Sequence, residues 1–335
     1  MFKRGAGLFG DIVRQADFVL LGLCCAATAY GLVMITSATR FLDTYRHVLV
    51  QAAAALIGIV LYFLISTIDL TVIVKLTFIL LLAYQLSWLK ENRDLKSVPS
   101  MMMLGGHLAL VVGLYYVISS DMGSVLVYAF AFACMAFAAG VAIRWFVLAL
   151  LGGGFTFYAL WEENKIPPHI VDRFLVLFDH SYDPQGVGWH QTRSLLALGG
   201  GELTGQGLFN GTQTQSEFSW SLPFRHTDFI FSAIGEELGL IGCVLVLALL
   251  AAIVIRCLMT TTKAKTPMEA YVCVGIAGML IFQTISNVGM CLFVMPVIGL
   301  TLPFFSYGGS SILTLFVAMG MVSSVRSHTL PDWLK

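Results

Sequence analysis

Long apolar runs dominate this sequence and limit what it can fold into. A helix that crosses the hydrocarbon core of a bilayer needs about 20 mostly apolar residues. Because short connections separate most of the runs, neighbouring helices are expected to pair as antiparallel hairpins. We therefore predict an all-α, polytopic transmembrane bundle of nine to ten helices, with candidate spans at Asp17–Ser37, Val48–Thr67, Thr71–Leu89, Met101–Ile118, Gly123–Gly140, Trp145–Trp161, Phe229–Ile255, Ala270–Gly289 and Ser311–Val325.

The composition supports a membrane protein. Charged residues make up 11% of the chain, whereas a soluble globular protein carries about 25%. The formal net charge of zero gives no sign of a nucleic-acid partner, for which a basic balance is expected. The seven cysteines lie in or beside apolar runs without metal-ligand spacing, so we interpret them as small buried apolar side chains.

One polar segment, residues 162–228, interrupts the pattern. It carries many of the charges, a glycine cluster around 199–211, and the histidines His169, His180, His190 and His226. A long polar excursion among short hairpins is where function is usually found. We treat residues 1–335 as one membrane domain and residues 162–228 as a large extracytoplasmic loop region within it.

Positive residues in short connections stay cytoplasmic, and this rule orients the bundle. The linker at 256–265 and the stretch after the last run are basic, so residues 162–228 are expected outside. The basic residues before the first run place the N-terminus in the cytoplasm, and no cleavage site follows them. Six spans before an outer segment would instead place the N-terminus outside. Either one run does not fully cross, or one helix of a ten-helix plan is missing.

The sharpest motif is Arg225-His226-Thr227-Asp228-Phe229-Ile230-Phe231, which leads into Gly235-Glu236-Glu237-Leu238-Gly239. An acid where a helix emerges from the membrane is costly unless it is solvated or paired. In one interpretation Asp228 or Thr227 only caps the following helix. In the other, Asp228 is a general base at the membrane surface, and Arg225 and His226 favour its ionised form.

A second motif interrupts the apolar pattern at Pro303-Phe304-Phe305-Ser306-Tyr307-Gly308-Gly309-Ser310-Ser311. Non-helical backbone at membrane depth is tolerated only where it is buried in protein or lines a cavity. The segment is therefore either a tight turn with Ser310 capping the last helix, or a pocket wall on the same face as Asp228. Asp121 is expected on that face too, where it either caps a helix or joins the site.

In their order along the chain, these motifs resemble the SEDS family (shape, elongation, division and sporulation), which includes RodA, FtsW and SpoVE. The resemblance covers the chain from Asp121 onward and rests on His226–Phe231, Gly235–Gly239 and Pro303–Ser311. The context of Gly211-Thr212-Gln213 and Leu222-Pro223 is more similar to RodA than to FtsW.

The resemblance implies a peptidoglycan glycosyltransferase that polymerises lipid II into glycan strands outside the membrane, for cell-wall synthesis, cell shape or division. Asp228 holds the position of the family's essential acid. Substrate-binding roles are expected for Arg173, Arg193, Arg225, His226, Asp121, Ser306, Gly308, Gly309 and Ser310. Each arginine could instead brace a loop. A divalent cation, Mg²⁺ or Mn²⁺, is compatible with the anionic leaving group. No organic cofactor is implied, and the expected partners are lipid II, membrane lipids and a class B penicillin-binding protein.

The sequence also departs from the family. Members usually carry Gln-Pro-Ser-Glu-x-x-Lys before their fourth helix, whereas this chain retains only a possible remnant at Lys75-Leu76-Thr77, with Val72 in place of the glutamate. This departure is consistent with a deleted helix and with the conflict in orientation. Two alternatives stay open: a transporter that flips lipid II, and a non-catalytic scaffold of the SEDS fold.

Overall fold

The described part of the computed structural model comprises residues 17–39, 46–66, 78–119, 122–163, 168–179, 186–216, 218 and 221–329. Within these ranges the protein is all-α and has no strand. Its helices are α2 (Phe18–Thr39), α3 (Arg46–Ser66), α5 (Phe78–Asn92), α6 (Val98–Ser119), α7 (Met122–Ala139), α8 (Ile143–Glu162), α9 (Pro168–Phe178), α10 (Val187–Gly200), α11 (Ile230–Thr261), α12 (Pro267–Cys291) and α13 (Gly309–Thr329).

The prediction of an all-helical membrane bundle is confirmed. Six of the helices in the described ranges are long and apolar enough to cross a bilayer, namely α2, α6, α7, α8, α11 and α12. Two shorter apolar stretches lie in α3 and α13. Each of the predicted spans overlaps one of these helices or α5, although residues 71–77 of the third run lie outside the described residues.

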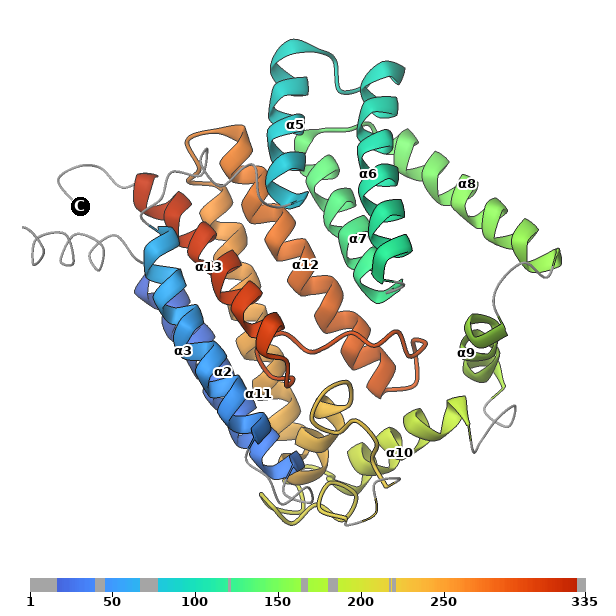
Figure 1. Ribbon diagram of the computed structural model, residues 1–335, viewed down its shortest axis with the longest axis vertical. Helices are drawn as coiled ribbons and strands as arrows, with labels where there is room; N and C mark the ends of the chain where they lie inside the picture. Colours follow the sequence, from blue (N-terminus) through green and yellow to red (C-terminus); the bar gives the residue numbers. More distant parts are fainter. Residues whose placement is uncertain are drawn as a thin grey trace, which may run out of the picture.

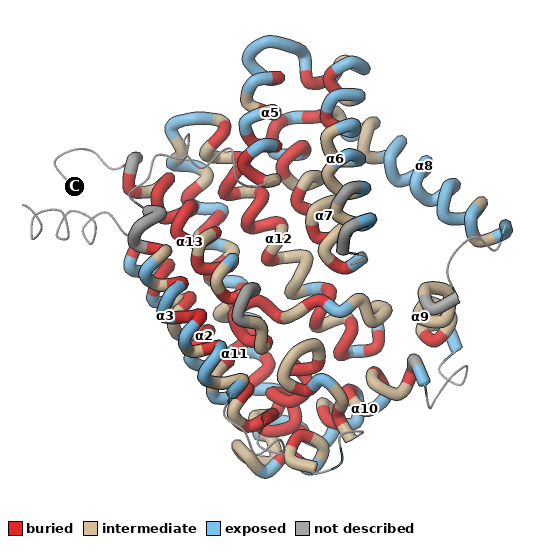
Figure 2. Tube along the Cα trace, in the orientation of Figure 1, coloured by how far each residue is buried: buried red, intermediate tan, exposed pale blue. Residues whose placement is uncertain are grey.

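Helix packing is densest around α11, α12 and α13. In Figure 1, α2, α3 and α13 run side by side with α11, and α12 separates them from α5, α6 and α7. Buried residues are frequent along α11, α12 and α13 (Figure 2), and α13 packs mainly on α3. By contrast, α8 stands away from the bundle and has no buried residue.

A buried ion-pair cluster fixes which helix ends share one membrane face. Arg256 near the end of α11 and Arg326 near the end of α13 both contact the Asp17 carboxylate, at 3.1 and 2.7 Å. Asp17 directly precedes α2, so α2 begins on the side where α11 and α13 end. The basic residues of that side place it in the cytoplasm, in agreement with the basic N-terminus.

The same cluster locates the conflict in orientation. The Tyr62 hydroxyl of α3 donates to the Asp17 carbonyl at 2.9 Å, so α3 ends on the cytoplasmic side. The ammonium group of Lys90, near the end of α5, lies 5.8 Å from the ring of Tyr271, near the start of α12. Two successive helices, α3 and α5, therefore end on one side. The conflict in orientation therefore lies between α3 and α5, and the residues that join them, 67–77, lie outside the described residues.

The outer end of α11 is not a regular helix. Gly239 has φ +66°, in the left-handed region, and interrupts the helical ladder. The outer segment supplies the missing partners, because Leu240 N donates to Glu202 O at 3.0 Å and Gln206 N donates to Glu236 O at 2.9 Å. A Cβ atom on Gly201 would lie 1.8 Å from the Gly235 carbonyl oxygen, so glycine is required for this close packing.

Candidate functional site

Asp228 lies in a tight turn, residues 223–229, immediately before α11. The N-cap residue of α11 is Phe229, and no side chain caps the helix. The interpretation that Asp228 or Thr227 is only a helix cap is therefore wrong. The turn closes on Phe224, whose φ is +50°, and the N–H groups of Thr227 and Phe229 both donate to its carbonyl at 3.1 Å.

Three consecutive carbonyl groups of this turn are held by other segments. Asn287 of α12 donates through Nδ2 to Asp228 O at 2.8 Å and to Leu300 O at 2.7 Å. The Ser306 hydroxyl donates to Thr227 O at 2.6 Å, and Tyr307 N donates to His226 O at 2.8 Å. The structure thus brings the Ser306 motif against the Asp228 turn, and its role as a pocket wall stays a prediction.

The Asp228 side chain is half-buried, and none of the described residues donates a hydrogen bond to its carboxylate. Burial removes water from the carboxylate and raises its pKa. This differs from the expectation that Arg225 and His226 favour ionisation. A raised pKa still suits a general base, because proton transfer is most efficient when the pKa of the base approaches the working pH.

The Arg225 side chain does not contact the Asp228 carboxylate but binds the outer loop. Its guanidinium donates to the carbonyls of Gln213 and Ser216 at 3.1 Å and also to the carbonyl of Thr214. The residue is 1% exposed. Burial lowers its pKa to about 10, and the nearby Glu236 and Glu237 oppose this shift. In this structure Arg225 braces the outer loop, and its predicted contact with substrate stays a prediction.

Two buried glutamates of α11 organise the same loop. Glu236 accepts hydrogen bonds from the backbone N–H groups of Gln213 and Thr214 at 2.6 and 2.7 Å, and from the Thr214 and Thr212 hydroxyls at 2.5 and 3.0 Å. Glu237 accepts from the Ser37 hydroxyl of α2 and from Gln215. The Gly-Glu-Glu-Leu-Gly motif therefore shapes the outer loop beside the Asp228 turn.

Two residues that the sequence analysis did not single out, His47 and Gln51, reach the site from α3. The rings of His47 and His226 lie 5.1 Å apart, and both approach Tyr307. Burial, together with His47 and Arg225, lowers the pKa of His226 to about 4, which keeps its imidazole neutral near pH 7. Gln51 donates to Ser306 O at 3.1 Å and accepts from Gly308 N at 3.0 Å. Helical spacing of His47 and Gln51 is the only sequence signal that links them.

The outer helix α10 is fastened beside the turn. Gln191 donates through Nε2 to the carbonyls of Met290 and Met295 at 3.1 and 2.8 Å. The Ser194 hydroxyl lies 2.5 Å from that of Ser232 and donates to Cys291 O at 2.8 Å. The predicted outer loop thus contains a helix that is bound to α11 and α12.

The other predicted site residues are placed as follows. Arg193 lies on α10 with its guanidinium 4.1 Å from the Trp189 ring centre. Arg173 is half-buried on α9, and α9 packs on α10. Gly309 begins α13. Asp121 and the side chain of Ser310 lie outside what the structure describes. No contact among the described residues tests the substrate roles of the two arginines.

The described residues do not form a recognisable metal-binding site. These residues contain no group of three or more His, Cys, Asp or Glu side chains that could hold one. We therefore assign no chemical step to a metal, and the expected divalent cation stays a prediction.

Comparison with known proteins adds independent evidence. The family model described as cell cycle protein, FtsW/RodA/SpoVE, matches residues 72–330. The peptidoglycan glycosyltransferase MrdB of Escherichia coli K12 is 40% identical over 156 residues, which are 47% of this chain and 41% of that protein. The chain thus matches less than half the length of this relative.

Solved structures show the same fold. One similar chain comes from a structure that describes the coordination of polymerization and crosslinking by a peptidoglycan synthase complex. It superposes with a TM-score of 0.75 at 25% sequence identity. The match covers 95% of this chain and 99% of that one. The rod shape determining protein RodA of Thermus thermophilus gives a TM-score of 0.65 at 25% identity, covering 95% and 98%.

Proposed function

Because this chain belongs to the FtsW/RodA/SpoVE family of cell cycle proteins, we propose that it is a peptidoglycan glycosyltransferase. It is a multi-pass protein of a bacterial inner membrane. Its proposed substrate is lipid II, a disaccharide peptide on an undecaprenyl pyrophosphate, which it joins into glycan strands on the outer face. The relative named peptidoglycan glycosyltransferase supports this proposal.

The observation that carries the proposal is the Asp228 turn. Its backbone is fixed by α12 and by the 302–308 segment, while its carboxylate takes no hydrogen bond from the described residues. The carboxylate takes the proton from the 4-hydroxyl of the acceptor sugar. That oxygen bonds to the anomeric carbon of the donor, and undecaprenyl pyrophosphate leaves. A base held in place by backbone contacts loses little entropy when it meets the acceptor.

The partner is proposed to be a class B penicillin-binding protein that crosslinks the new strands. The similar synthase complex couples polymerisation with crosslinking, which supports a partner of this kind. A divalent cation bound mainly by the pyrophosphate would assist departure of the leaving group. This arrangement fits the finding that the described side chains offer no cluster of metal ligands.

The test uses purified protein with its crosslinking partner and fluorescent lipid II. The wild type should give glycan ladders, and Asp228→Asn should give none while it unfolds at a temperature no lower than the wild type. Normal ladders from Asp228→Asn would show that the assignment of the base is wrong. Transfer of lipid II across vesicles without ladders, by wild type and variant alike, would favour the transporter instead.

A further inference from the structure

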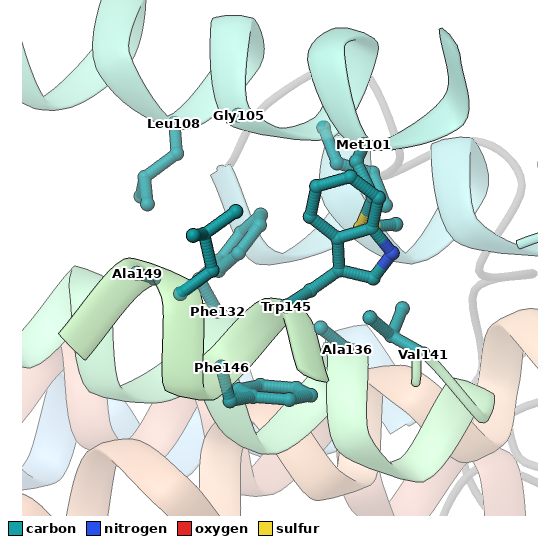
Figure 3. A pocket seen from close by; sticks show the side chains of 11 residues that line it. Met101, Gly105, Leu108, Phe132, Ala136, Val141, Trp145, Phe146 and Ala149 are labelled. Carbon is teal, nitrogen blue, oxygen red and sulfur yellow. The ribbon is translucent and has the colours of Figure 1, made fainter. Parts of the chain in front are cut away.

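An apolar pocket of about 290 Å³ lies between α6, α7 and the first half of α8 (Figure 3). Leu104 and Gly105 line it from α6, Ala136 from α7, and Trp145 and Phe146 from α8. No lining residue carries a charge. The volume is at the lower limit of small-molecule pockets, which begin at about 300 Å³. The pocket therefore suits one flexible hydrocarbon chain better than a folded, polar ligand.

The pocket exists because α8 packs on the bundle at its start, through Trp145 and Phe146, and diverges from it further along. Many aliphatic side chains of α8 are exposed, and the exposed fractions of Leu148 and Leu151 are 58% and 65%. Figure 2 shows α8 as an exposed helix beside the bundle. An empty space would deprive the lining atoms of dispersion contacts. In a bilayer, hydrocarbon chains of lipid are the available filling.

At the cytoplasmic edge of the pocket lie the cationic side chain of Arg144 and the backbone of Lys96. The Arg144 guanidinium lies 5.8 Å from the ring of Trp145, which lines the pocket. Arg144 and Trp145 donate to the same Lys96 carbonyl, at 3.0 and 3.4 Å. The end of α5 and its connection to α6 carry the exposed charged residues Lys90, Glu91, Arg93, Asp94 and Lys96. With Arg144 these give four cations and two anions, a net charge of +2.

We propose that this pocket binds an acyl chain of an anionic phospholipid from the cytoplasmic leaflet, with Arg144 and Lys96 holding the phosphate. Basic pockets between transmembrane helices on the cytoplasmic side select anionic head groups. Trp145 supplies the amphipathic ring that is typical of the membrane interface. The bound lipid provides the packing that α8 lacks. Because the pocket lies at the face opposite the Asp228 turn, its occupancy is separate from the proposed catalysis.

Native mass spectrometry of the full chain tests the head group. The detergent-purified protein is mixed with equal amounts of dioleoyl phosphatidylglycerol and dioleoyl phosphatidylcholine. The wild type should retain phosphatidylglycerol in preference. Arg144→Gln and Lys96→Gln should each lower that preference roughly fivefold, because a cation near the surface contributes about 1 kcal/mol. Glu91→Gln, which removes an anion near the end of α5 on the same membrane face, should raise it.

A matched pair of glycines tests the pocket. A Cβ atom on Gly105 or on Gly106 would meet nothing within 4 Å, but only Gly105 lines the pocket. Gly105→Leu fills the space and should reduce retained phosphatidylglycerol, whereas Gly106→Leu should leave it unchanged. Both variants replace a glycine of α6 by leucine, so a difference in lipid retention between them does not come from a general effect on that helix.

Three outcomes would overturn the proposal. One is equal lipid retention by Gly105→Leu and Gly106→Leu. Another is an unchanged preference after both cations are neutralised, which does not depend on how Gly105→Leu folds. The third is retention of phosphatidylcholine as strong as that of phosphatidylglycerol, which would show that the pocket accepts any acyl chain.

Discussion

Replacing Glu236 by glutamine tests the claim that this buried carboxylate holds the outer loop. Each of its two oxygens accepts one backbone N–H and one threonine hydroxyl, and the residue is fully buried. Glutamine keeps one oxygen and replaces the other with an NH₂ group. A hydroxyl can rotate and accept from that group. The backbone N–H of Gln213 or Thr214 cannot, and it is left facing another donor.

The structure sets the size of the effect. A buried donor without an acceptor costs roughly 1–3 kcal/mol, and hydrogen bonds to a neutral group are weaker by about 1 kcal/mol than those to a charged one. Since two bonds to the surviving oxygen also lose the charge, we expect Glu236→Gln to reduce the free energy of unfolding by roughly 3–5 kcal/mol. Polymerisation should also fall, because the loop that Arg225 and Glu236 hold lies beside the Asp228 turn.

Glu202→Gln is the matched control. Glu202 lies in the same outer segment, but it is exposed, and exposed substitutions usually change stability by no more than about 0.5 kcal/mol. Thermal unfolding in detergent measures stability, and hydrogen exchange at residues 206–216 measures loop opening. If Glu236→Gln unfolds and exchanges like Glu202→Gln, the network does not hold the loop.

Three further predictions concern Asp228, Asn287 and Asp17. Burial raises the pKa of Asp228, so the folded protein carries a desolvation cost above that pKa and loses it as the pH falls. Asp228→Asn should therefore match or exceed wild-type stability at pH 7, and wild-type polymerisation should fall as acid protonates the base. A destabilised Asp228→Asn variant, or a rate that does not change with pH, would contradict this account. Asn287→Leu removes the amide that donates to the carbonyls of Asp228 and Leu300. It should lower the free energy of unfolding by roughly 2–4 kcal/mol and reduce polymerisation. Unchanged thermal unfolding would argue against this role of Asn287. Asp17→Asn breaks the ion pairs with Arg256 and Arg326 and should lower the free energy of unfolding by about 3 kcal/mol. Polymerisation per folded molecule should not change, because Asp17 lies at the face opposite the Asp228 turn. A specific loss of activity would show that the two faces are coupled.

The helical bundle was predictable because each span needs its own apolar run, and such runs are visible in sequence. The outer segment was less predictable. Helix α10 has a short apolar stretch, and its position depends on Gln191 and Ser194 binding carbonyls of a distant part of the chain. Likewise, α8 has the composition of a packed transmembrane helix, and nothing in its own sequence indicates that it stands apart.

The candidate site was also predictable from the sequence only in part. The position of Asp228 at the outer end of a helix followed from the motif. The direction of the Arg225 side chain did not, because the left-handed backbone of Phe224 turns it toward the loop carbonyls. His47 and Gln51 precede Asp228 by more than 170 residues in sequence, so only the packing of α3 against α13 brings them to the site.

The break at Gly239 has a consequence for how this protein is made. The first turns of α11 complete their hydrogen bonds with Glu202 and Gln206, which belong to the segment that must first be exported. A nascent α11 that entered the lipid by itself would expose those amide and carbonyl groups to hydrocarbon. Export of the preceding segment must therefore come first, and the Asp228 turn is complete only after the later residues Asn287, Ser306 and Tyr307 have reached it.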